Sequence, residues 1–281
     1  MKLIIDCGST KADWVIVKGD KTIKKFQTEG FNPNYTDKKH ISSIIINEVG
    51  YKLYIQDITE IFFYGTGCGK TQNCNLIHEL LKSVFDKADI FVTHDIMAAC
   101  HALFGNNKGI ACILGTGSNS CYYDGENIVE KAVSLGYIIG DDGSGSHIGK
   151  ELLRAYFYKE MPDELSYMFE KEYDIEIMSI IDKIYHNSQS SKYLASFSKF
   201  AFDNINHEYI KKLCKNCFDE FIRHFVLIYN SRGHKQTGSP LIDLMLVKSP
   251  HTSHPTSSQY FQYSVASFPR LIITFLAGRS T

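Results

Sequence analysis

Two glycine-containing turns carry hydroxyl side chains directly after short apolar runs. The first is "DCGSTKADW", Asp6 to Trp14, and the second is "LGTGSNS", Leu114 to Ser120. Glycine lets the backbone approach a ligand closely, and serine and threonine add hydroxyl groups beside backbone N–H donors, a combination that suits a phosphate group. In the first turn Lys11 adds a positive charge, and Asp6 could hold Mg²⁺ through water. Either stretch alone is compatible with a hairpin turn, but the repetition favours a phosphate clamp built from two half-domains.

Three aspartates lie where carboxylate chemistry is plausible. Asp95 stands in "THDIMAACHAL", between an apolar run that ends at Val92 and a helical pattern. It could cap that helix, or it could accept a proton from a substrate hydroxyl that attacks phosphorus. Asp141 and Asp142 lie in the glycine turn of "GDDGSGSHIG", before a helix that we expect to begin near Ser146. Such a pair suits hydrogen bonds to sugar hydroxyls or water-mediated metal binding, and it is also common in a solvated turn.

The stretch "YGTGCGKTQ", residues 64–72, resembles a nucleotide-binding P-loop at first sight. That motif needs G-x-x-x-x-G-K-[ST], since both glycines let the backbone N–H groups surround a phosphate. Counting back from "GKT", the first glycine should stand at position 64, which is Tyr64. The stretch is therefore interpreted as a strand-to-helix turn, with the phosphates held elsewhere.

The pattern of apolar residues predicts an α/β protein with two domains. Three strands are followed by alternating helices and strands, and from Gly109 a second set of three strands begins, with helical periodicity from Gly149 almost to residue 230. Two duplicated, strand-rich units that face each other would place a ligand between them. The expected domains are residues 1–108, residues 109–231 with a helical insertion, and an atypical tail. The expected elements of the first domain are strands 2–6, 13–19, 21–30, 58–65 and 89–92 and helices 37–50, 75–85 and 95–105.

The tail, residues 232–281, differs in composition from the rest of the chain. It holds one acidic residue, Asp243, and four of the 6 prolines, and it has no clear helical or strand period. This shift indicates a poorly ordered segment or one foreign to the ancestral sequence. We hypothesise that these residues are read out of frame, which resequencing of the coding DNA tests.

Bulk composition excludes several classes of protein. With 30 basic and 31 acidic residues the net charge is −1, which provides no field for nucleic acid or an anionic membrane. The apolar run at the start of the sequence is too short for a signal peptide, and no apolar run in the sequence reaches the length of a membrane span. Eight cysteines without a secretory signal suggest free thiols in a reducing cytoplasm.

The two glycine turns, the Asp95 stretch "THDIMAACHAL" and the Asp141–Asp142 stretch together resemble the sugar kinase/Hsp70/actin superfamily. More narrowly, "DCGSTKADW", "LGTGS" and "GDDGSG" are similar to the BadF/BadG/BcrA/BcrD ATPase family, especially its N-acetylglucosamine kinase branch, over residues 1 to about 230. The resemblance implies two RNase H-like domains with ATP and Mg²⁺ in the cleft between them, and a sugar 6-phosphate as product.

The same resemblance implies roles for individual residues. Asp95 corresponds to the family's catalytic base, and Asp141 corresponds to an aspartate that contacts the sugar. Gly145 corresponds to a position close to the N-acetyl group of the sugar. In "GFNPNY", Asn32 and Asn34 fall where the sugar-binding loop begins. The residues implied to contact the transferred phosphate are Asp6 (through Mg²⁺), Gly8, Ser9, Thr10 and Lys11. Those implied to contact the nucleotide with its phosphates are Gly115, Thr116, Gly117, Ser118 and Asn119.

Two departures from the family pattern leave questions open. A bulky aromatic residue often precedes the third motif, whereas "VSLGYIIG" has Leu135 and Tyr137, which puts the choice of sugar in doubt. The family's glycine-rich adenosine motif is matched poorly by "QTGSPLIDLM".

We expect a small-molecule sugar as partner, with no nucleic acid and no membrane, and the sequence leaves open whether the chain forms a homodimer.

Two other functions are compatible with parts of the sequence. One is the family's other branch, ATPases that activate 2-hydroxyacyl-CoA dehydratases and aryl-CoA reductases and hold an iron–sulfur cluster with cysteines. "CKNC", Cys214 to Cys217, invites that interpretation, but both thiols fall on one apolar helical stripe and are expected to fill the core. The other is a non-catalytic sugar sensor, which would have no need of Asp95 as a base.

Overall fold

The computed structural model describes residues 1–9, 11–49, 55–187, 189–231, 243–247, 260–262 and 272–276. The chain divides into two compact units, Met1–His101 and Ala102–Thr281.

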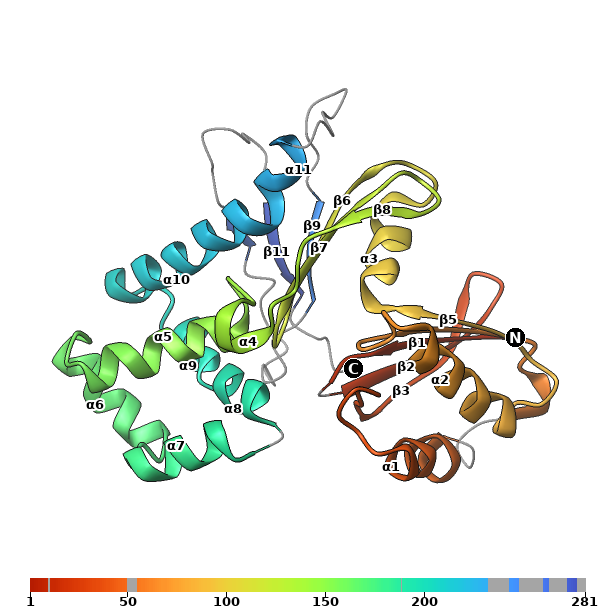
Figure 1. The fold of residues 1–281 in the computed structure, drawn as a ribbon, viewed down its shortest axis with the longest axis horizontal. Coiled ribbons are helices and arrows are strands. Elements are labelled where there is room, and N and C mark those ends of the chain that lie inside the picture. The colour runs from red at the N-terminus through yellow and green to blue at the C-terminus, as the bar shows by residue number, and fades with distance from the viewer. Residues whose placement is uncertain are drawn as a thin grey trace. The chain divides into compact units, whose positions relative to one another are not determined.

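The first unit is built on a five-stranded mixed sheet (Figure 1). Its strand order is β3-β2-β1-β4-β5; β2 is antiparallel to both β1 and β3, whereas β4 is parallel to both β1 and β5. An antiparallel meander extended by two parallel strands is the arrangement that the RNase H-like fold requires. The strands are β1 (Lys2–Cys7), β2 (Lys11–Lys18), β3 (Lys21–Glu29), β4 (Glu60–Gly65) and β5 (Asp89–His94).

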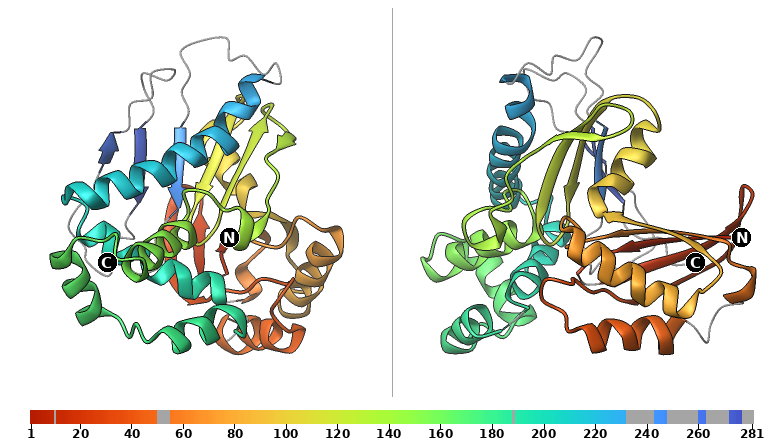
Figure 2. Two further views of the ribbon diagram at one scale, coloured as in Figure 1. Left: turned by 60° about the vertical axis from the view of Figure 1, so that its left-hand side comes forward. Right: turned by 45° about the vertical axis from the view of Figure 1, so that its right-hand side comes forward.

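Alternating apolar residues hold this sheet to its helices. In β1 every second side chain, Leu3, Ile5 and Cys7, is fully buried, which is the period of a strand with one face on the core. The buried Trp14 of β2 stacks on Phe26 of β3 at a centroid distance of 5.9 Å. The helical elements are α1 (Lys38–Ser43), η1 (Ile44–Val49), η3 (Ile55–Asp57), α2 (Thr71–Val84) and α3 (Asp95–Phe104), and α1 and α2 lie on the same side of the sheet (Figures 1 and 2).

The predicted helix over residues 37–50 is confirmed with one difference. Ile41, Ile44, Ile45 and Val49 are all buried, as their spacing predicts. The helix begins at the cap residue Asp37, but its second half, η1, is wound as a π-helix.

The second unit combines an antiparallel meander with a large helical layer (Figure 1). Its strands β6 (Gly109–Leu114), β7 (Ser118–Tyr123) and β8 (Ile128–Lys131) pair in sequence order. Helix α5 is central, because α8, α9 and α10 all pack against it. The helices are α4 (Gly136–Ile139), α5 (Gly145–Phe157), α6 (Asp163–Glu172), α7 (Ile177–Tyr185), α8 (Ser190–Ser196), α9 (Ser198–Asp203), α10 (Glu208–Phe221), η4 (Ile222–Val226) and α11 (Leu227–Ser231).

Three short strands are described within the tail: β9 (Asp243–Val247), β10 (Tyr260–Gln262) and β11 (Ile272–Leu276). β11 is parallel to β9 and antiparallel to β10, and β9 lies beside β6. The rest of 232–281 lies outside the described residues, so the predicted atypical character of the tail stays a prediction, as do the predicted domain limits. Within the described ranges, none of the helices has both the length and the apolar character that crossing a membrane requires.

Candidate active site

Three parallel strands of the first unit end in one row. The register pairs Cys7 of β1 with Gly65 of β4, and Gly65 with His94 of β5. The residues that follow these strands therefore emerge at the same edge of the sheet, which is where open α/β sheets bind ligands. Asp95 is one of these residues, and "DCGST" supplies another segment of the edge. The predicted catalytic base and the first phosphate turn are thus brought to one edge by the sheet itself.

The first turn is closed by its own backbone. The Gly8 N–H donates to the Lys11 carbonyl oxygen at 3.0 Å, and Lys11 Nζ lies 3.7 Å from Asp13 Oδ2. Asp6 and Ser9 are exposed at the surface of this unit. Thr10, the remaining predicted phosphate contact, lies outside the described residues.

The predicted sugar loop is fastened to the glycine turn that resembled a P-loop. Asn32 Oδ1 accepts hydrogen bonds from the Asn34 backbone N–H at 3.0 Å and from Asn34 Nδ2 at 3.2 Å. Asn73 Nδ2 donates to Asn34 Oδ1 at 3.1 Å and to the Gly67 carbonyl oxygen at 2.7 Å. Gly67 has a φ of 80°, and a Cβ there would overlap Asn32 Oδ1. Residues 65–70 therefore form the strand-to-helix turn that the sequence predicts, and this turn supports the asparagine loop.

Asp95 is the first residue of α3 and is half-buried. Its Oδ1 accepts the N–H of the next residue, Ile96, at 2.9 Å. Burial raises the pKa of the Cys68 thiol to about 12, and the charges of Cys74 and Asp95 add to that rise. The thiol of Cys7 in turn donates to the Phe31 carbonyl oxygen at 3.5 Å, next to Asn32. The carboxylate, the first turn and the asparagine loop therefore lie together within the first unit.

In the second unit, the second phosphate turn and the "GDDGSG" loop are hydrogen-bonded to each other. The Gly145 N–H donates to the Gly115 carbonyl oxygen at 2.8 Å, and the Ser146 N–H donates to the Thr116 carbonyl oxygen at 3.1 Å. These bonds bring the predicted nucleotide residues and the predicted sugar residues onto one continuous surface.

Asp141 is the residue at which these two segments meet. Its Oδ1 accepts the Ser118 N–H at 3.3 Å, and its side chain leaves no room for a Cβ on Gly117, which would lie 2.8 Å from Oδ2. Asp141 has a φ of 57°, a left-handed conformation that is uncommon for residues other than glycine and often marks a functional site. Burial raises the pKa of its carboxyl group, and the charge of Asp142 adds to the rise, whereas the Ser118 N–H opposes it.

Two buried polar atoms in the second turn have no hydrogen-bond partner among the described residues. They are Ser118 Oγ and Asn119 Oδ1. Since buried polar atoms are nearly always paired in folded proteins, a polar ligand at this turn would satisfy them. Ser118 Oγ and the backbone N–H groups of the turn can donate to phosphate oxygens, whereas Asn119 Oδ1 only accepts and would need a donor such as a hydroxyl or amino group, and a nucleotide such as ATP carries all of these.

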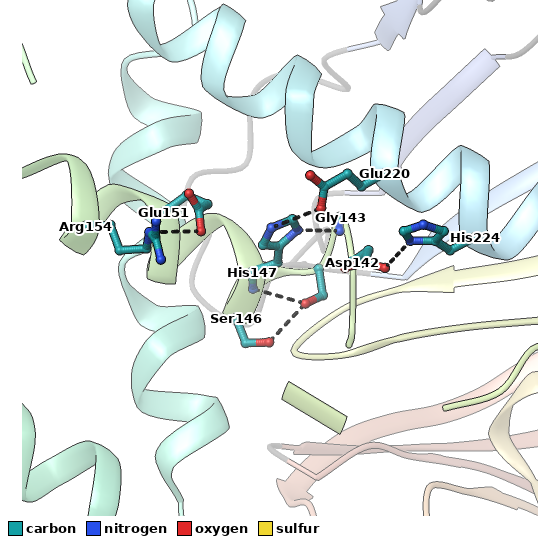
Figure 3. Close-up of polar contacts among 9 residues, drawn as sticks. Asp142, Gly143, Ser146, His147, Glu151, Arg154, Glu220 and His224 are labelled. Carbon is teal, nitrogen blue, oxygen red and sulfur yellow. Dashed lines mark hydrogen bonds and ion pairs between the residues drawn. The ribbon is translucent and has the colours of Figure 1, made fainter. Parts of the chain in front are cut away.

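Three further polar residues surround this loop, and sequence reasoning missed them (Figure 3). His147 Nδ1 accepts the Gly143 N–H at 3.0 Å, His147 Nε2 lies 3.7 Å from Glu220 Oε2, and His224 Nδ1 lies 2.7 Å from Asp142 Oδ2. His147 is three residues past the helix cap Ser144, the position of the reciprocal partner in a capping box, and that signal was available in the sequence. Glu220 and His224 are far away in the chain and gave no local signal.

The cysteines of "CKNC" are core residues, as the helical stripe predicts. Cys214 is fully buried and Cys217 nearly so, in the cluster that includes Ile210, Phe218 and Phe221. Burial raises the pKa of the Cys214 thiol to about 12, so it is not a thiolate at neutral pH. All eight cysteines are free.

Residues 5–211 match the model of the BadF/BadG/BcrA/BcrD ATPase family. The chain belongs to this family. Among solved structures, a Porphyromonas gingivalis protein assigned by name as an N-acetylglucosamine kinase is 37% identical, with a TM-score of 0.79 over 88% of this chain and 84% of that one. A curated relative, the N-acetylmuramic acid/N-acetylglucosamine kinase of Clostridium acetobutylicum, is 25% identical over 224 residues, which are 74% of this chain and 70% of the relative.

A third protein from Chromobacterium violaceum, with a similar name, is 13% identical with a TM-score of 0.54 over 87% of this chain and 85% of that one, and supports the fold alone. Together with the strand order of the first unit, these similarities confirm the predicted fold class: α/β, of the two-unit sugar-kinase type, with a helix-rich second unit.

Proposed function

We propose that this member of the BadF/BadG/BcrA/BcrD ATPase family is an ATP-dependent sugar kinase, a phosphotransferase with an alcohol acceptor. The proposed acceptor is the 6-hydroxyl of N-acetylglucosamine or of a related amino sugar or hexose. Family membership and the names of two relatives support this choice. The observation that carries it is the hydrogen bond from the Ser118 N–H to Asp141, which joins the turn suited to phosphates to the carboxylate suited to sugar hydroxyls.

In this proposal the second unit binds the nucleotide and contributes part of the sugar site. The N–H groups and hydroxyls of Gly115 to Asn119 would bind phosphate oxygens, and the orphaned Ser118 Oγ would donate to one of them, whereas Asn119 Oδ1 would accept from a donor group of the ligand, such as a hydroxyl. Asp141 would accept hydrogen bonds from sugar hydroxyls, and Gly145, with its backbone at the same surface, would lie against the N-acetyl group. A carboxylate held by one backbone donor in a mostly buried site is a strong acceptor for a sugar hydroxyl.

The first unit would supply the reacting groups. Asp95 would take the proton of the attacking hydroxyl, a general-base role that needs a positioned carboxylate, and its contact with the Ile96 N–H fixes that position. Asn32 and Asn34 would hold other sugar hydroxyls from the loop that Gly67 and Asn73 support. Gly8, Ser9, Thr10 and Lys11 would face the transferred phosphate. Mg²⁺, held through water at Asp6, would neutralise charge that develops on that phosphate.

The two other functions are less well supported. An activator ATPase of the iron–sulfur type needs thiolate ligands, whereas Cys214 and Cys217 are buried, protonated thiols in an apolar core. A sugar sensor needs no base, yet Asp95 stands at the same sheet edge as the first phosphate turn. The eight free thiols suit a reducing cytoplasm, which we propose as the site of action, and gel filtration decides between a monomer and a homodimer.

A coupled ADP-release assay on the full chain with Mg²⁺ tests this function. The sugars are N-acetylglucosamine, glucosamine, glucose, N-acetylmannosamine and N-acetylmuramic acid, with a control that lacks sugar. We expect release that depends on an amino sugar and saturates with it. Equal release with and without sugar would favour an ATPase instead, and sugar binding without any release would favour a sensor.

A further inference from the structure

Two histidines contact the "GDDGSG" loop, His224 at the Asp142 carboxylate and His147 at the Gly143 N–H, and Glu220 lies near the His147 ring (Figure 3). His224 of η4 lies 2.7 Å from Asp142 Oδ2, and His147 of α5 lies 3.7 Å from Glu220 Oε2 of α10. His147 also accepts the Gly143 N–H within the loop itself. Helix α10 and its continuation η4 therefore flank the loop that carries Asp141.

The direction of one hydrogen bond fixes the tautomer of His147. A ring nitrogen that accepts an N–H has no proton, so Nδ1, which accepts the Gly143 N–H at 3.0 Å, is unprotonated. A neutral ring then carries its proton on Nε2, which faces Glu220. Burial lowers the pKa of His147 and Lys150 lowers it further, against the opposing charges of Glu220, Glu151 and Asp142, so the neutral ring is favoured.

This tautomer argues against a metal site. The ligand atoms of Asp142, His147 and Glu220 lie within 4.8 Å of one another, which by distance alone could hold an ion. A histidine that binds a metal usually donates the N–H of its other nitrogen to an acceptor, whereas the other nitrogen of His147 accepts an N–H. Coordination through Nε2 would require the ring to give up the Gly143 bond. These residues are better described as a clasp on the loop, in which Gly143 is hydrogen-bonded to His147, Asp142 is hydrogen-bonded to His224, and Glu220 lies 3.7 Å from the His147 ring.

The clasp acts where the loop backbone is most constrained. Gly143 has a φ of 72°, and a Cβ there would lie 2.6 Å from Phe221 Cβ of α10. Two residues earlier Asp141 has its own left-handed φ of 57°. A left-handed residue other than glycine, such as Asp141, persists only when its surroundings hold it, and the buried bond from Gly143 to His147 holds the same turn.

We propose that His147 is a positioning residue for Asp141, acting through the Gly143 amide, with Glu220 orienting the ring and His224 holding Asp142. This inference rests on the proposed function insofar as Asp141 binds the sugar. His147 itself touches no substrate. Its removal would release the turn and let the Asp141 carboxylate leave the direction set by Ser118.

Two variants of His147 separate positioning from folding. In His147→Asn the amide oxygen can take the place of Nδ1 and still accept the Gly143 N–H, whereas His147→Leu has no acceptor. We expect His147→Leu to raise the sugar KM about tenfold or more while the ATP KM changes little, and His147→Asn to stay near the wild-type sugar KM. Ile210→Val, a buried change at the far end of α10, is the control, and its sugar KM should equal that of the wild type.

A role in folding alone would lower the amount of active enzyme without changing the KM of the folded fraction. Equal sugar KM values for the wild type and for His147→Leu would therefore overturn the proposal. So would a tenfold rise in His147→Asn, since that variant keeps the acceptor.

A second measurement does not depend on activity. Nitrogen-15 NMR of the full protein should show a pyridine-like Nδ1 and a pyrrole-like Nε2 for His147, with a Gly143 amide that is protected from hydrogen exchange in the wild type and in His147→Asn but not in His147→Leu. A protonated Nδ1, or a ring that binds added Zn²⁺, would overturn the clasp. If the wild type phosphorylates none of the sugars, the proposed function fails, and the tautomer and amide protection then decide on loop positioning by themselves.

Discussion

Gly117→Ala should affect sugar binding more than folding, because the three atoms nearest to the added methyl group all belong to the side chain of Asp141. A Cβ at this position would lie 2.8 Å from Oδ2, 3.0 Å from Cγ and 3.1 Å from Oδ1 of Asp141. The cheapest relief is rotation of that short side chain, since the neighbouring backbone is held by the bonds from Gly145 to Gly115 and from Ser146 to Thr116. Rotation breaks the 3.3 Å bond from the Ser118 N–H and turns the carboxylate away from the sugar.

The expected magnitude follows from the lost contact. A hydrogen bond to a charged group contributes about 1.5–3 kcal/mol, so the sugar KM should rise about 10- to 150-fold. The unfolding free energy should fall by about 1–3 kcal/mol, because the Ser118 N–H loses its carboxylate partner while no core residue moves. Steady-state kinetics over a range of sugar concentrations and urea unfolding measure the two quantities. Gly69→Ala is the matched control, since a Cβ there meets nothing within 4 Å. A folded Gly117→Ala protein with the wild-type sugar KM would refute the assignment of Asp141 to the sugar.

Three other outcomes are expected. Burial raises the pKa of Asp141, so the folded state binds its proton more readily than the unfolded chain does, and unfolding free energy falls as pH rises from the ordinary value of 3.8 through the raised pKa. Asp141→Asn keeps an acceptor for the Ser118 N–H and suits a left-handed backbone. Urea unfolding at pH 7 should therefore give an unfolding free energy equal to or greater than that of the wild type, together with a large loss of sugar affinity. The prediction is contradicted if the unfolding free energy of Asp141→Asn relative to the wild type is lower at pH 7 than at pH 5. Gly67→Ala places a left-handed alanine against Asn32 Oδ1, so it should lower the unfolding free energy by about 1–3 kcal/mol and raise the sugar KM. An unchanged sugar KM would show that this turn does not support the sugar-binding loop. The purified protein should be colourless and free of iron by elemental analysis, whereas stoichiometric iron would revive the activator ATPase.

Much of the fold could be predicted because its signals are local. The alternation of Leu3, Ile5 and Cys7 gives β1, and the spacing of Ile41, Ile45 and Val49 gives a helix. The π-helical winding of Ile44–Val49 could not be predicted, since π-helices are rare and the spacing of the apolar residues in this stretch fits an α-helix.

The candidate site was predictable where its residues stand in short motifs, as with Gly8, Ser118 and Asp141. Contacts between distant segments were not predictable. The bond from the Ser118 N–H to Asp141 joins residues 23 positions apart, and the contact between Asp142 and His224 spans 82 positions. Such pairs depend on how α5 and α10 pack, and a single sequence gives no direct signal for that packing.

The most direct test of the central claim is phosphorus-31 NMR of a reaction that contains the full-length protein, ATP, Mg²⁺ and N-acetylglucosamine. The account predicts a new phosphate monoester coupled to the protons on carbon 6, formed in step with ADP. In Asp95→Asn its rate of formation should fall by about a hundredfold or more, the range for loss of a general base, while sugar binding measured by calorimetry changes little. An Asp95→Asn protein that forms the ester at the wild-type rate, or a wild type that releases inorganic phosphate and no ester from any of the sugars, would contradict it.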